Sequence, residues 1–380
     1  MRVYKISKNT PLNKLFGEIG VTKEGSKILQ RKAGVNLIYI KDIKSPAANI
    51  LKQDALSIGA DLAVPKDCVT CRAEFVDAIL IANDTMLKKL SIKERTQPFG
   101  LKDLAKSLSD FVLFRQEKTK IMGVLNANND SFFSQSRFCA DDARKKIEAM
   151  MEEGADIIDI GGVSSRPGSV GVSENEEFTR VKDIIETVRK YKLYERVEFS
   201  LDSYSPLSLK YALDSGFSIV NDITALKNDE VALLASKYDA TVVLMHKLGS
   251  TQDMQKDPHY DNVVLDVDDF FAQRIKKAKD FGIKDIILDV GIGFGKKLEH
   301  NLSLLQNLEH FLHFDCPLLV GASRKSMIDM IYPSQIKERL PGTLAIHLES
   351  IKRGASILRV HDVKEHIQAI KVQKAIEEAF

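Results

Sequence analysis

The sequence predicts an α/β protein in which a parallel (βα)8 TIM barrel follows a small α+β N-terminal domain. Eight short apolar runs alternate with eight helical stretches between about residues 118 and 376, and barrels of this kind are typically about 250 residues long. Polar groups follow four of these runs, and a parallel barrel gathers its functional side chains where its strands end. A doubly wound open sheet has the same alternation, but eight evenly spaced units favour closure into a barrel.

The eight predicted strands are rich in β-branched residues and cover 120–126, 155–162, 198–204, 218–224, 240–246, 285–295, 317–323 and 356–361. The predicted helices cover 141–154, 173–191, 205–216, 228–238, 263–281, about 299–312, about 341–353 and 362–378. Several of these helices have recognisable ends. Gly154 and Gly216 are typical C-terminal caps, Ser173 and Glu176 have the spacing of a capping box, and Pro206 lies in a first helical turn.

Residues 1–115 have a different pattern. Helical and strand-like stretches lie at 47–67, 71–90 and 99–111. We therefore expect a small α+β domain at 1–115, joined near 112–119 to a barrel domain at 116–380. The sequence does not assign a role to this N-terminal domain.

The composition excludes several classes of protein. The net charge is +2, from 55 Lys+Arg and 53 Asp+Glu, whereas nucleic-acid binding needs a concentrated basic face. No run approaches the roughly 18 apolar residues of a membrane span. The N-terminal segment MRVYKISKNTPLNKLF has no apolar signal-peptide core. We expect a cytoplasmic protein that binds neither nucleic acid nor membranes.

Cys68 and Cys71 form one CxxC motif, while Cys139 and Cys316 lie far from it and from each other. A structural zinc site usually needs a second cysteine or histidine pair. Both cysteines could be buried small hydrophobes, since cysteine is among the most buried residue types. The motif alone therefore leaves any role of Cys68 and Cys71 open.

The polar strand ends carry mostly cationic side chains together with selected carboxylates. These ends are GGVSSRPGS (161–169), LDVGIGFGK (288–296), VGASRKS (320–326) and LRVHDV (358–363), which contain Arg166, Asp289, Lys325, Arg359 and His361. A pocket of this composition suits a substrate that is part anion and part hydrogen-bonding heterocycle.

Asp202, Asn221 and Asp222 lie at or next to two further strand ends. Each of them alone is more often a cap or a turn residue. Together with Asp289 they would form a set of carboxylates and an amide on three strands. Carboxylates can accept the N–H donors of an aminopyrimidinone ring, and the amide both donates and accepts.

Three glycines follow Asp289, at Gly291, Gly293 and Gly295. They free the backbone, so that a flat ring can approach it closely, and Phe294 between them could pack against a second ring. A dinucleotide site would need GxGxxG in the first strand-turn-helix unit, with an acidic residue about 20 positions later. Neither the spacing nor the position fits.

Arg359 and His361 are two residues apart and therefore point to the same side of the last strand. Their apolar neighbours Leu358 and Val360 point toward the covering helices, so the polar pair is predicted inside the barrel. Both side chains can donate hydrogen bonds to phosphate oxygens. Lys325 could bind a heterocycle carbonyl, although a solvated helix start would have the same pattern.

Two further residues at strand ends have weaker signals. Asn126 precedes a polar loop containing Asp130, which is either a surface loop with Asx turns or a lid over a hydrated metal and a phosphate. His246 ends the fifth strand, and a lone histidine is more often structural than part of a site.

Seven blocks together resemble, in order and spacing, the signatures of the dihydropteroate synthase family. They are IMGVLN, GGVSSRPGS, LDSYSP, IVNDI, LDVGIGFGK, VGASRKS and LRVHDV, and the match covers about residues 119–378. The resemblance implies a transferase of folate biosynthesis that condenses dihydropterin-CH₂-diphosphate with 4-aminobenzoate, giving dihydropteroate and diphosphate. It also implies Mg²⁺, a homodimer and sensitivity to sulfonamides, although the sequence fixes neither the oligomeric state nor the sulfonamide affinity.

The resemblance also assigns roles to individual residues. It implies that the pterin ring is bound by Asp202, Asn221, Asp289 and Lys325. It implies that the diphosphate is bound by Asn126, Arg359 and His361, with Asn126 also meeting the metal. The residues implied for 4-aminobenzoate are Phe132, Ser165, Arg166, Pro167, Phe294 and Ser323. The implied catalytic set is Asp202, Asp289, Lys325, Arg359 and His361.

The sequence departs from the family pattern in three places. The first loop reads NANNDSFFSQS, where the family usually has NVTPDSFSDGG, so Asn128 and Asn129 replace Thr-Pro and Ser134 replaces the later acid. Val163 stands in the place of the usual glutamate, and Val290 in the place of the usual proline. The effect of the altered first loop stays open.

The mechanism that the resemblance implies follows from the charges. Diphosphate leaves once Mg²⁺, Arg359 and His361 neutralise it. The electron-rich ring and nearby carboxylates, Asp202 with Asp130 as a further candidate, then stabilise the resulting pterin methylene cation. The aryl amine then attacks, without a strong general base, because an aniline nitrogen is unprotonated at neutral pH.

Two other functions have a related pattern. A methyltetrahydrofolate-corrinoid methyltransferase shares the barrel and the pterin-binding carboxylates, but it has no diphosphate for Arg359 and His361 to bind. A non-catalytic pterin-binding partner protein is the other alternative, suggested by the altered first loop.

Overall fold

The structure, a computed structural model, describes residues 3, 6, 11–111, 118–127, 136–163, 172–249, 254 and 256–379. The chain divides into two compact units. One is formed by Met1–Arg115 together with Gln373–Phe380, and the other by Gln116–Val372. The domain boundaries expected from the sequence, 1–115 and 116–380, stay a prediction.

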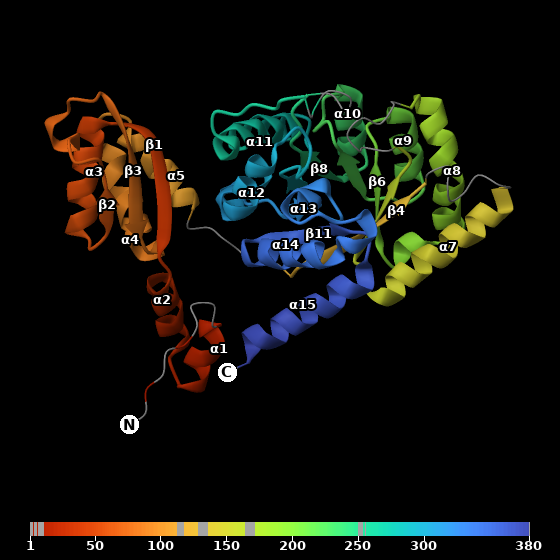
Figure 1. Cartoon of the computed structure of the whole chain (residues 1–380), viewed down its shortest axis with the longest axis horizontal. Helices are drawn as coiled ribbons and strands as arrows, with labels where there is room; N and C mark the ends of the chain where they lie inside the picture. Colours follow the sequence, from red (N-terminus) through yellow and green to blue (C-terminus); the bar gives the residue numbers. More distant parts are fainter. Residues whose placement is uncertain are drawn as a thin grey trace. The chain divides into compact units, whose positions relative to one another are not determined.

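In the described part of the second unit, eight parallel strands close into a barrel (Figure 1). They are β4 (Lys120–Asn126), β5 (Ile157–Gly161), β6 (Glu198–Asp202), β7 (Ile219–Asp222), β8 (Thr241–Met245), β9 (Ile286–Asp289), β10 (Leu318–Val320) and β11 (Ala355–Val360). Each strand pairs with its neighbours in chain order, and β11 returns to β4 with Arg359 beside Met122. The predicted (βα)8 fold is confirmed.

The barrel interior has an apolar layer and a polar layer, because alternate residues of each strand point inward. The apolar layer is one buried cluster of Met122, Ile157, Ile219, Val243, Ile287, Leu319 and Ile357. Two residues further along four of these strands come Asp159, Asn221, Asp289 and Arg359. The polar layer therefore lies at the carboxyl ends of the strands.

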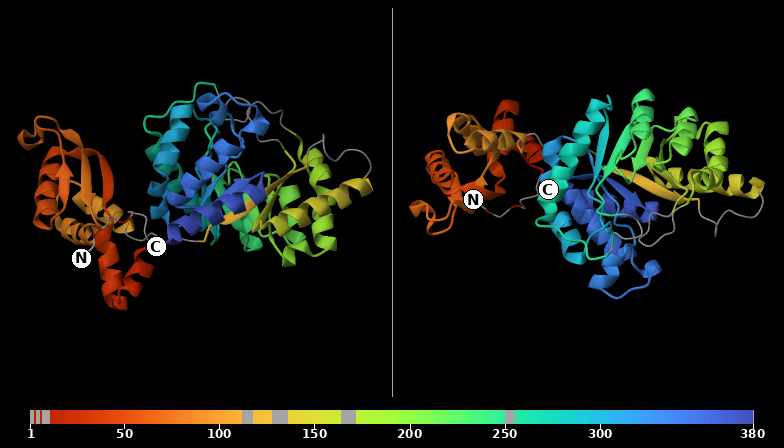
Figure 2. Two further views of the ribbon diagram at one scale, coloured as in Figure 1. Left: turned by 60° about the horizontal axis from the view of Figure 1, so that its bottom comes forward. Right: turned by 90° about the horizontal axis from the view of Figure 1, so that it is seen from above.

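Helices cover the outside of the barrel (Figures 1 and 2). They are α7 (Ser136–Glu153), α8 (Glu174–Lys190), α9 (Pro206–Asp214), α10 (Asp229–Lys237), α11 (Val263–Asp280), α12 (Leu298–Gln306), α13 (Ser326–Ile331), α14 (Leu340–Lys352) and the first part of α15 (Val363–Glu378), whose residues from Gln373 on belong to the first unit. Outward strand residues such as Ile158 and Val220 join helix residues such as Val181 in one large core. The Ser173 hydroxyl accepts the Glu176 N–H at 3.3 Å, which confirms the predicted helix start.

Two predicted elements are wrong in part. The strand predicted over 285–295 ends at Asp289, because Gly291, Gly293 and Gly295 have positive φ angles of 68°, 82° and 62° and form a loop. The helix predicted near 299–312 divides into α12 and the 3₁₀ helix η4 (Leu308–Phe314). The amide of Asn307 donates to the Ser303 carbonyl at 2.8 Å, and such local bonds compete with helix continuation.

The described part of the first unit contains an antiparallel sheet of order β1–β3–β2. Its elements are α1 (Leu12–Glu18), α2 (Lys23–Ala33), β1 (Asn36–Lys44), α3 (Ser45–Ser57), β2 (Asp61–Ala63), β3 (Phe75–Ala82), α4 (Asp84–Lys93) and α5 (Leu101–Asp110). Leu51, Leu80, Leu87 and Leu108 form part of its own apolar core. The predicted α+β character is confirmed, although the sequence analysis did not predict α1, α2 or β1.

Short 3₁₀ turns complete the described secondary structure at Cys68–Thr70, Glu94–Thr96, Leu193–Glu195 and Ile336–Glu338. Within the described residues, each helix is too short or too polar to cross a membrane.

Candidate active site

The polar layer of the barrel is organised around Arg359. Its guanidinium binds two carboxylates from neighbouring strands, through Nε at 2.7 Å from Asp159 Oδ2 and through Nη2 at 2.8 Å from Asp202 Oδ2. Nη2 also lies 2.6 Å from Asp159 Oδ2. The barrel therefore brings the ends of β5, β6 and β11 together in one charged cluster.

Asp159 is a site residue that the sequence analysis missed. It is fully buried, and the Asn221 amide lies 3.2 and 3.3 Å from its two oxygens. The carboxylate thus positions both Asn221 and Arg359. The missed signal is a charged residue at an inward position of the apolar run ADIIDIGG, because a buried charge usually has a partner.

Burial disfavours the charged forms of Asp202 and Asp289. Burial raises the pKa of Asp202 to about 7, although the Arg359 guanidinium opposes this shift. Burial also raises the pKa of Asp289, against the effects of Lys325 and of the Gly291 N–H. For Arg359 itself, burial disfavours the charge, but Asp159 and Asp202 outweigh it and raise the pKa further.

The glycine loop after β9 shapes one wall of the site. The Gly291 N–H donates to Asp289 Oδ1 at 2.8 Å, and any side chain at Gly291 would collide with the His246 carbonyl. Lys325 reaches over this loop, where its amine bonds to the Ile292 carbonyl and lies 4.2 Å from the centre of the Phe294 ring. Burial lowers the pKa of Lys325 to about 8, and Asp289 partly counteracts this shift.

Lys296 fixes the glycine loop from behind. It is buried and donates to the carbonyls of Gly291 at 3.0 Å and Phe294 at 3.1 Å, and its amine lies 2.9 Å from His246 Nδ1. Burial lowers the pKa of Lys296 to about 7. Burial lowers the pKa of His246 to about 2, and the charge of Lys296 makes a smaller contribution in the same direction. These contacts give His246 a structural role, and the sequence analysis did not select Lys296.

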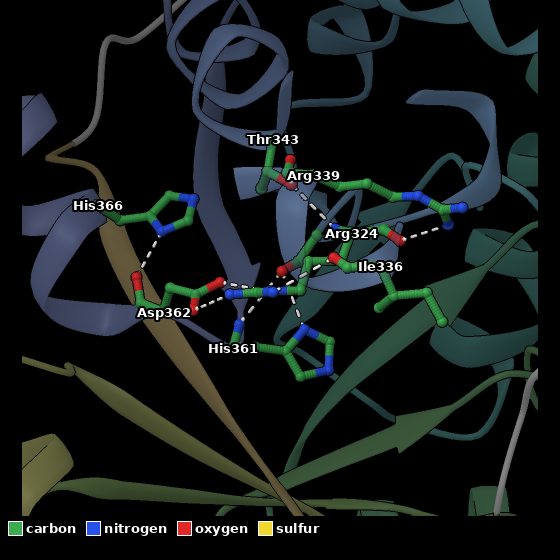
Figure 3. Close-up of polar contacts among 8 residues, drawn as sticks. Arg324, Ile336, Arg339, Thr343, His361, Asp362 and His366 are labelled. Carbon is green, nitrogen blue, oxygen red and sulfur yellow. Dashed lines mark hydrogen bonds and ion pairs between the residues drawn. The ribbon is translucent and has the colours of Figure 1, made fainter. Parts of the chain in front are cut away.

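The loops after β10 and β11 are linked at the rim of the site (Figure 3). His361 Nδ1 lies 2.9 Å from the Ser323 hydroxyl, and Arg324 bonds to Asp362. Asn126 is exposed at the end of β4, where Gly161 lies between it and Asp202. The structure thus brings Asp202, Asn221, Asp289, Lys325 and Arg359 into one layer, with Asn126, Ser323 and His361 at the rim.

Four of the residues that the resemblance implies as binding 4-aminobenzoate lie outside the described residues. They are Phe132, Ser165, Arg166 and Pro167. The same holds for the altered loop positions Asn128, Asn129 and Ser134. Phe294 and Ser323 are the members of that set within the described residues.

A buried pair of histidines supports the β10 loop from below. His347 Nε2 accepts the Ala322 N–H at 3.1 Å, so its proton is on Nδ1, which lies 2.8 Å from His366 Nε2. His366 Nδ1 then donates to the Asp362 carbonyl at 2.6 Å. This pattern of donors and acceptors requires both imidazole rings to be neutral. Burial favours the neutral rings, because it lowers the pKa of His347 to about 3 and also lowers the pKa of His366.

Asp268, His310 and His313 form another cluster of possible metal ligands in the described residues. The group comes from α11 and η4 on the outside of the barrel. It is separate from the polar layer inside the barrel. The sequence analysis did not select any of its members.

Cys68 is buried, and burial raises the pKa of its thiol, with a further contribution from Cys71. A reactive cysteine needs the opposite shift, since the thiolate is the nucleophile. Cys68 therefore lacks the environment of a reactive thiolate, whereas Cys71 is exposed.

The family model described as pterin binding enzyme matches residues 122–361. The bifunctional dihydropteroate synthase/dihydropteroate reductase of Helicobacter pylori is 41% identical over 369 residues, which is 97% of each chain. The dihydropteroate synthase of Haemophilus influenzae is 40% identical over 264 residues, 68% of this chain and 94% of its own.

Solved structures agree with this result. The Yersinia pestis dihydropteroate synthase in a sulfonamide drug complex superposes with a TM-score of 0.65 at 36% identity, covering 70% of this chain and 97% of its own. The Thermus thermophilus enzyme in complex with 4-aminobenzoate gives a TM-score of 0.62 at 33% identity, with coverage of 69% and 96%.

Proposed function

The chain belongs to the dihydropteroate synthase family of pterin-binding enzymes, and on that premise we propose that it makes 7,8-dihydropteroate for folate biosynthesis. The reaction joins (7,8-dihydropterin-6-yl)methyl diphosphate to 4-aminobenzoate. The bond from the methylene carbon to the diphosphate oxygen breaks, and its electron pair leaves with diphosphate. The aryl amine forms the new C–N bond and releases a proton to solvent.

The observation that carries this proposal is the polar layer at the strand ends. Asp202, Asn221 and Asp289 offer carboxylate and amide groups to a ring with several N–H donors. An ionised carboxylate has about four lone-pair sites. Asp289 therefore keeps acceptor capacity after binding the Gly291 N–H. Lys325 supplies a donor for the ring carbonyl, and Phe294 supplies an apolar surface beside it.

Arg359 has two tasks in this proposal. Its Nε and Nη2 atoms bind Asp159 and Asp202, and Nη1 is our candidate donor to the diphosphate. His361, exposed at the rim beside Ser323, supplies a second donor. Stabilising the leaving diphosphate lowers the barrier to its departure, because charge develops on it in the transition state.

The exposed amide of Asn126 fits Mg²⁺, which takes oxygen ligands and usually binds through one or two protein groups together with substrate phosphates and water. Bound there, the ion would neutralise charge on the diphosphate. Asn126 would orient the phosphates at the rim, and Arg359 and His361 would hold them from the β11 side.

We assign 4-aminobenzoate to the space bordered by Phe294 and Ser323, with Phe132, Ser165, Arg166 and Pro167 as further candidates. Its aniline nitrogen is neutral at physiological pH, so the site needs no strong base. A homodimer and a cytoplasmic location also stay predictions. The named relatives give no support to the corrinoid methyltransferase or to the non-catalytic binding protein.

The synthase activity can be tested with purified protein, the pterin diphosphate, 4-aminobenzoate and Mg²⁺. We expect diphosphate release to equal dihydropteroate formation. Binding of the pterin diphosphate without product at any enzyme concentration would instead favour the non-catalytic alternative.

A second activity is proposed because the Helicobacter pylori relative, which matches this chain over both units, is named for a dihydropteroate reductase as well. Reduction of dihydropteroate adds a hydride and a proton, so it needs a hydride donor such as a reduced nicotinamide or a reduced flavin. The first unit is our candidate for this activity.

The reductase proposal is tested by supplying dihydropteroate with each class of hydride donor. We expect tetrahydropteroate from the full chain. A variant that lacks residues 1–112 should keep synthase activity, because the second unit holds all eight barrel strands and the site residues described above. Reductase activity that survives this deletion would assign it to the barrel, and no activity with any donor would exclude the second function.

A further inference from the structure

Three side chains with metal-binding chemistry converge on the outer surface of the barrel. Asp268 lies on α11, and His310 and His313 lie on η4. Asp268 Oδ1 is 3.0 Å from His310 Nε2 and 2.6 Å from His313 Nε2. The three ligand atoms all lie within 4.8 Å of one another. Both imidazoles thus direct the same nitrogen at one carboxylate oxygen.

The backbone makes this arrangement rigid. A 3₁₀ helix has three residues per turn, so His310 and His313 lie one above the other on one face, with ring centres 5.1 Å apart. Beneath them, Phe271 of α11 packs edge-on against Phe311 and Phe314, at 5.6 and 6.2 Å between ring centres. This aromatic contact fixes η4 against α11 and therefore holds the histidines opposite Asp268.

The cluster is also accessible to a cation. The three side chains are between 18% and 24% exposed, so an ion could enter from solvent and keep a water ligand.

We propose that Asp268, His310 and His313 bind one divalent transition-metal ion of the Zn²⁺ class, which links α11 to η4. Two imidazoles, one carboxylate and an open position form a common zinc ligand set. Bonds of about 2.0–2.1 Å in a tetrahedral site separate the ligand atoms by about 3.3 Å. The observed 2.6 and 3.0 Å separations would therefore open by about 0.7 and about 0.3 Å, while each imidazole proton moves to Nδ1.

The proposed site is distinct from the synthase site. Its ligands belong to the helical layer outside the barrel, whereas the diphosphate-binding candidates lie at the carboxyl ends of the strands. The proposed role of the ion is to stabilise the packing of α11. It is not a catalytic role, so it can be tested without substrates.

The test uses Zn²⁺ itself as the probe, in the full chain carrying Cys68→Ser and Cys71→Ser so that the CxxC motif cannot contribute. Calorimetry should show that the parent binds one Zn²⁺ per chain. In His313→Gln and in Asp268→Asn this binding should be lost, or its affinity should fall by at least about tenfold. A matched control is His259→Gln, because His259 is 85% exposed and is paired with Asp261. The control should bind Zn²⁺ like the parent.

Thermal unfolding separates loss of a ligand from loss of the fold. We expect Zn²⁺ to raise the Tm of the parent and of the control, but not that of His313→Gln, which should still unfold cooperatively. Co²⁺ in the parent should give the visible absorption of a four-coordinate site. Equal Zn²⁺ affinity in the parent, His313→Gln and Asp268→Asn would overturn the proposal, as would a parent that binds no Zn²⁺.

Discussion

Arg324 and Asp362 form a two-pronged ion pair, in which Nε lies 2.9 Å from Oδ2 and Nη2 lies 2.6 Å from Oδ1 (Figure 3). Arg324 lies between Ser323 and Lys325 in the loop after β10, and Asp362 follows His361 after β11. The pair therefore joins two segments that both carry proposed substrate-binding residues. The Thr343 hydroxyl fixes the same loop by accepting the Arg324 N–H at 2.9 Å.

Arg324→Lys should lower the kcat/KM for both substrates by roughly tenfold. Lysine keeps the charge but cannot form the fork, and losing a hydrogen bond to a charged group costs about 1.5 kcal/mol. Steady-state kinetics measure the effect. Arg144→Lys is a matched control, since Arg144 pairs with Glu148 on the outer helix α7. If both variants have the activity of the parent, the ion pair does not position the two loops.

Asp289→Asn should weaken binding of the pterin by about 1–3 kcal/mol, because an amide in place of a buried carboxylate leaves N–H donors without an acceptor. Calorimetry with a pterin alcohol that has no phosphates isolates this contribution. Asp285→Asn is the control, since Asp285 is exposed just before the start of the same strand. Equal pterin affinity for Asp289→Asn and the parent would refute the role we propose for Asp289.

The inward-facing residues could largely be predicted from the sequence, because strand periodicity is local. Arg359 and His361 were expected inside the barrel since Leu358 and Val360 have to face the helices, and Arg359 lies there. Asp159 was missed because its partners Asn221 and Arg359 come from distant strands. Periodicity gives the direction of a side chain, but it does not say which side chain lies opposite.

Other features could not be predicted from the sequence because they also depend on tertiary packing. A lysine after a glycine loop is usually solvated, and only the closed barrel shows that Lys296 is buried against three carbonyls. The strand end at Asp289 depends on the positive φ angles of the glycines that follow. The cluster of Asp268, His310 and His313 joins residues more than 40 positions apart, so no spacing rule could identify it.

Binding of the pterin alcohol should weaken as the pH falls below about 7. Burial raises the pKa of Asp202 to about 7, and the protonated carboxyl loses acceptor capacity, which costs up to about tenfold in affinity per pH unit. Calorimetry between about pH 5.5 and 8.5 measures the profile. An Asp202→Asn variant should bind weakly and show no such slope. A flat profile in the parent would exclude Asp202 as an ionised acceptor.

The carboxyl group of Asp202 should also make the free energy of unfolding depend on pH, but in the opposite direction to ligand binding. Its pKa is about 7 in the folded protein and 3.8 as the reference value for the unfolded chain, so the folded state binds the proton more tightly. Its contribution to the free energy of unfolding is therefore complete below about pH 4 and is lost as the pH rises through 7. Urea unfolding of the parent and of Asp202→Asn at a series of pH values should show this difference, and parallel curves would contradict it.

The diphosphate assignment is best tested at His361, because Arg359 also neutralises two carboxylates. Removing the Arg359 side chain would leave Asp159 and Asp202 uncompensated, which costs about 3–5 kcal/mol of stability for a buried pair. Arg359→Ala should therefore unfold more easily, so its loss of binding would be ambiguous. His361 is exposed and bonds to Ser323, so His361→Ala should leave the fold intact.

His361→Ala should weaken binding of the pterin diphosphate by roughly ten- to hundredfold, since a donor to a charged phosphate is worth about 1.5–3 kcal/mol. Its affinity for the pterin alcohol should stay close to that of the parent, because the alcohol has no phosphate for His361 to contact. Titrating the parent and the variant with both ligands gives the comparison, and the alcohol controls for general damage to the pocket. An equal loss for both ligands would mean that His361 shapes the pocket as a whole and does not select the diphosphate.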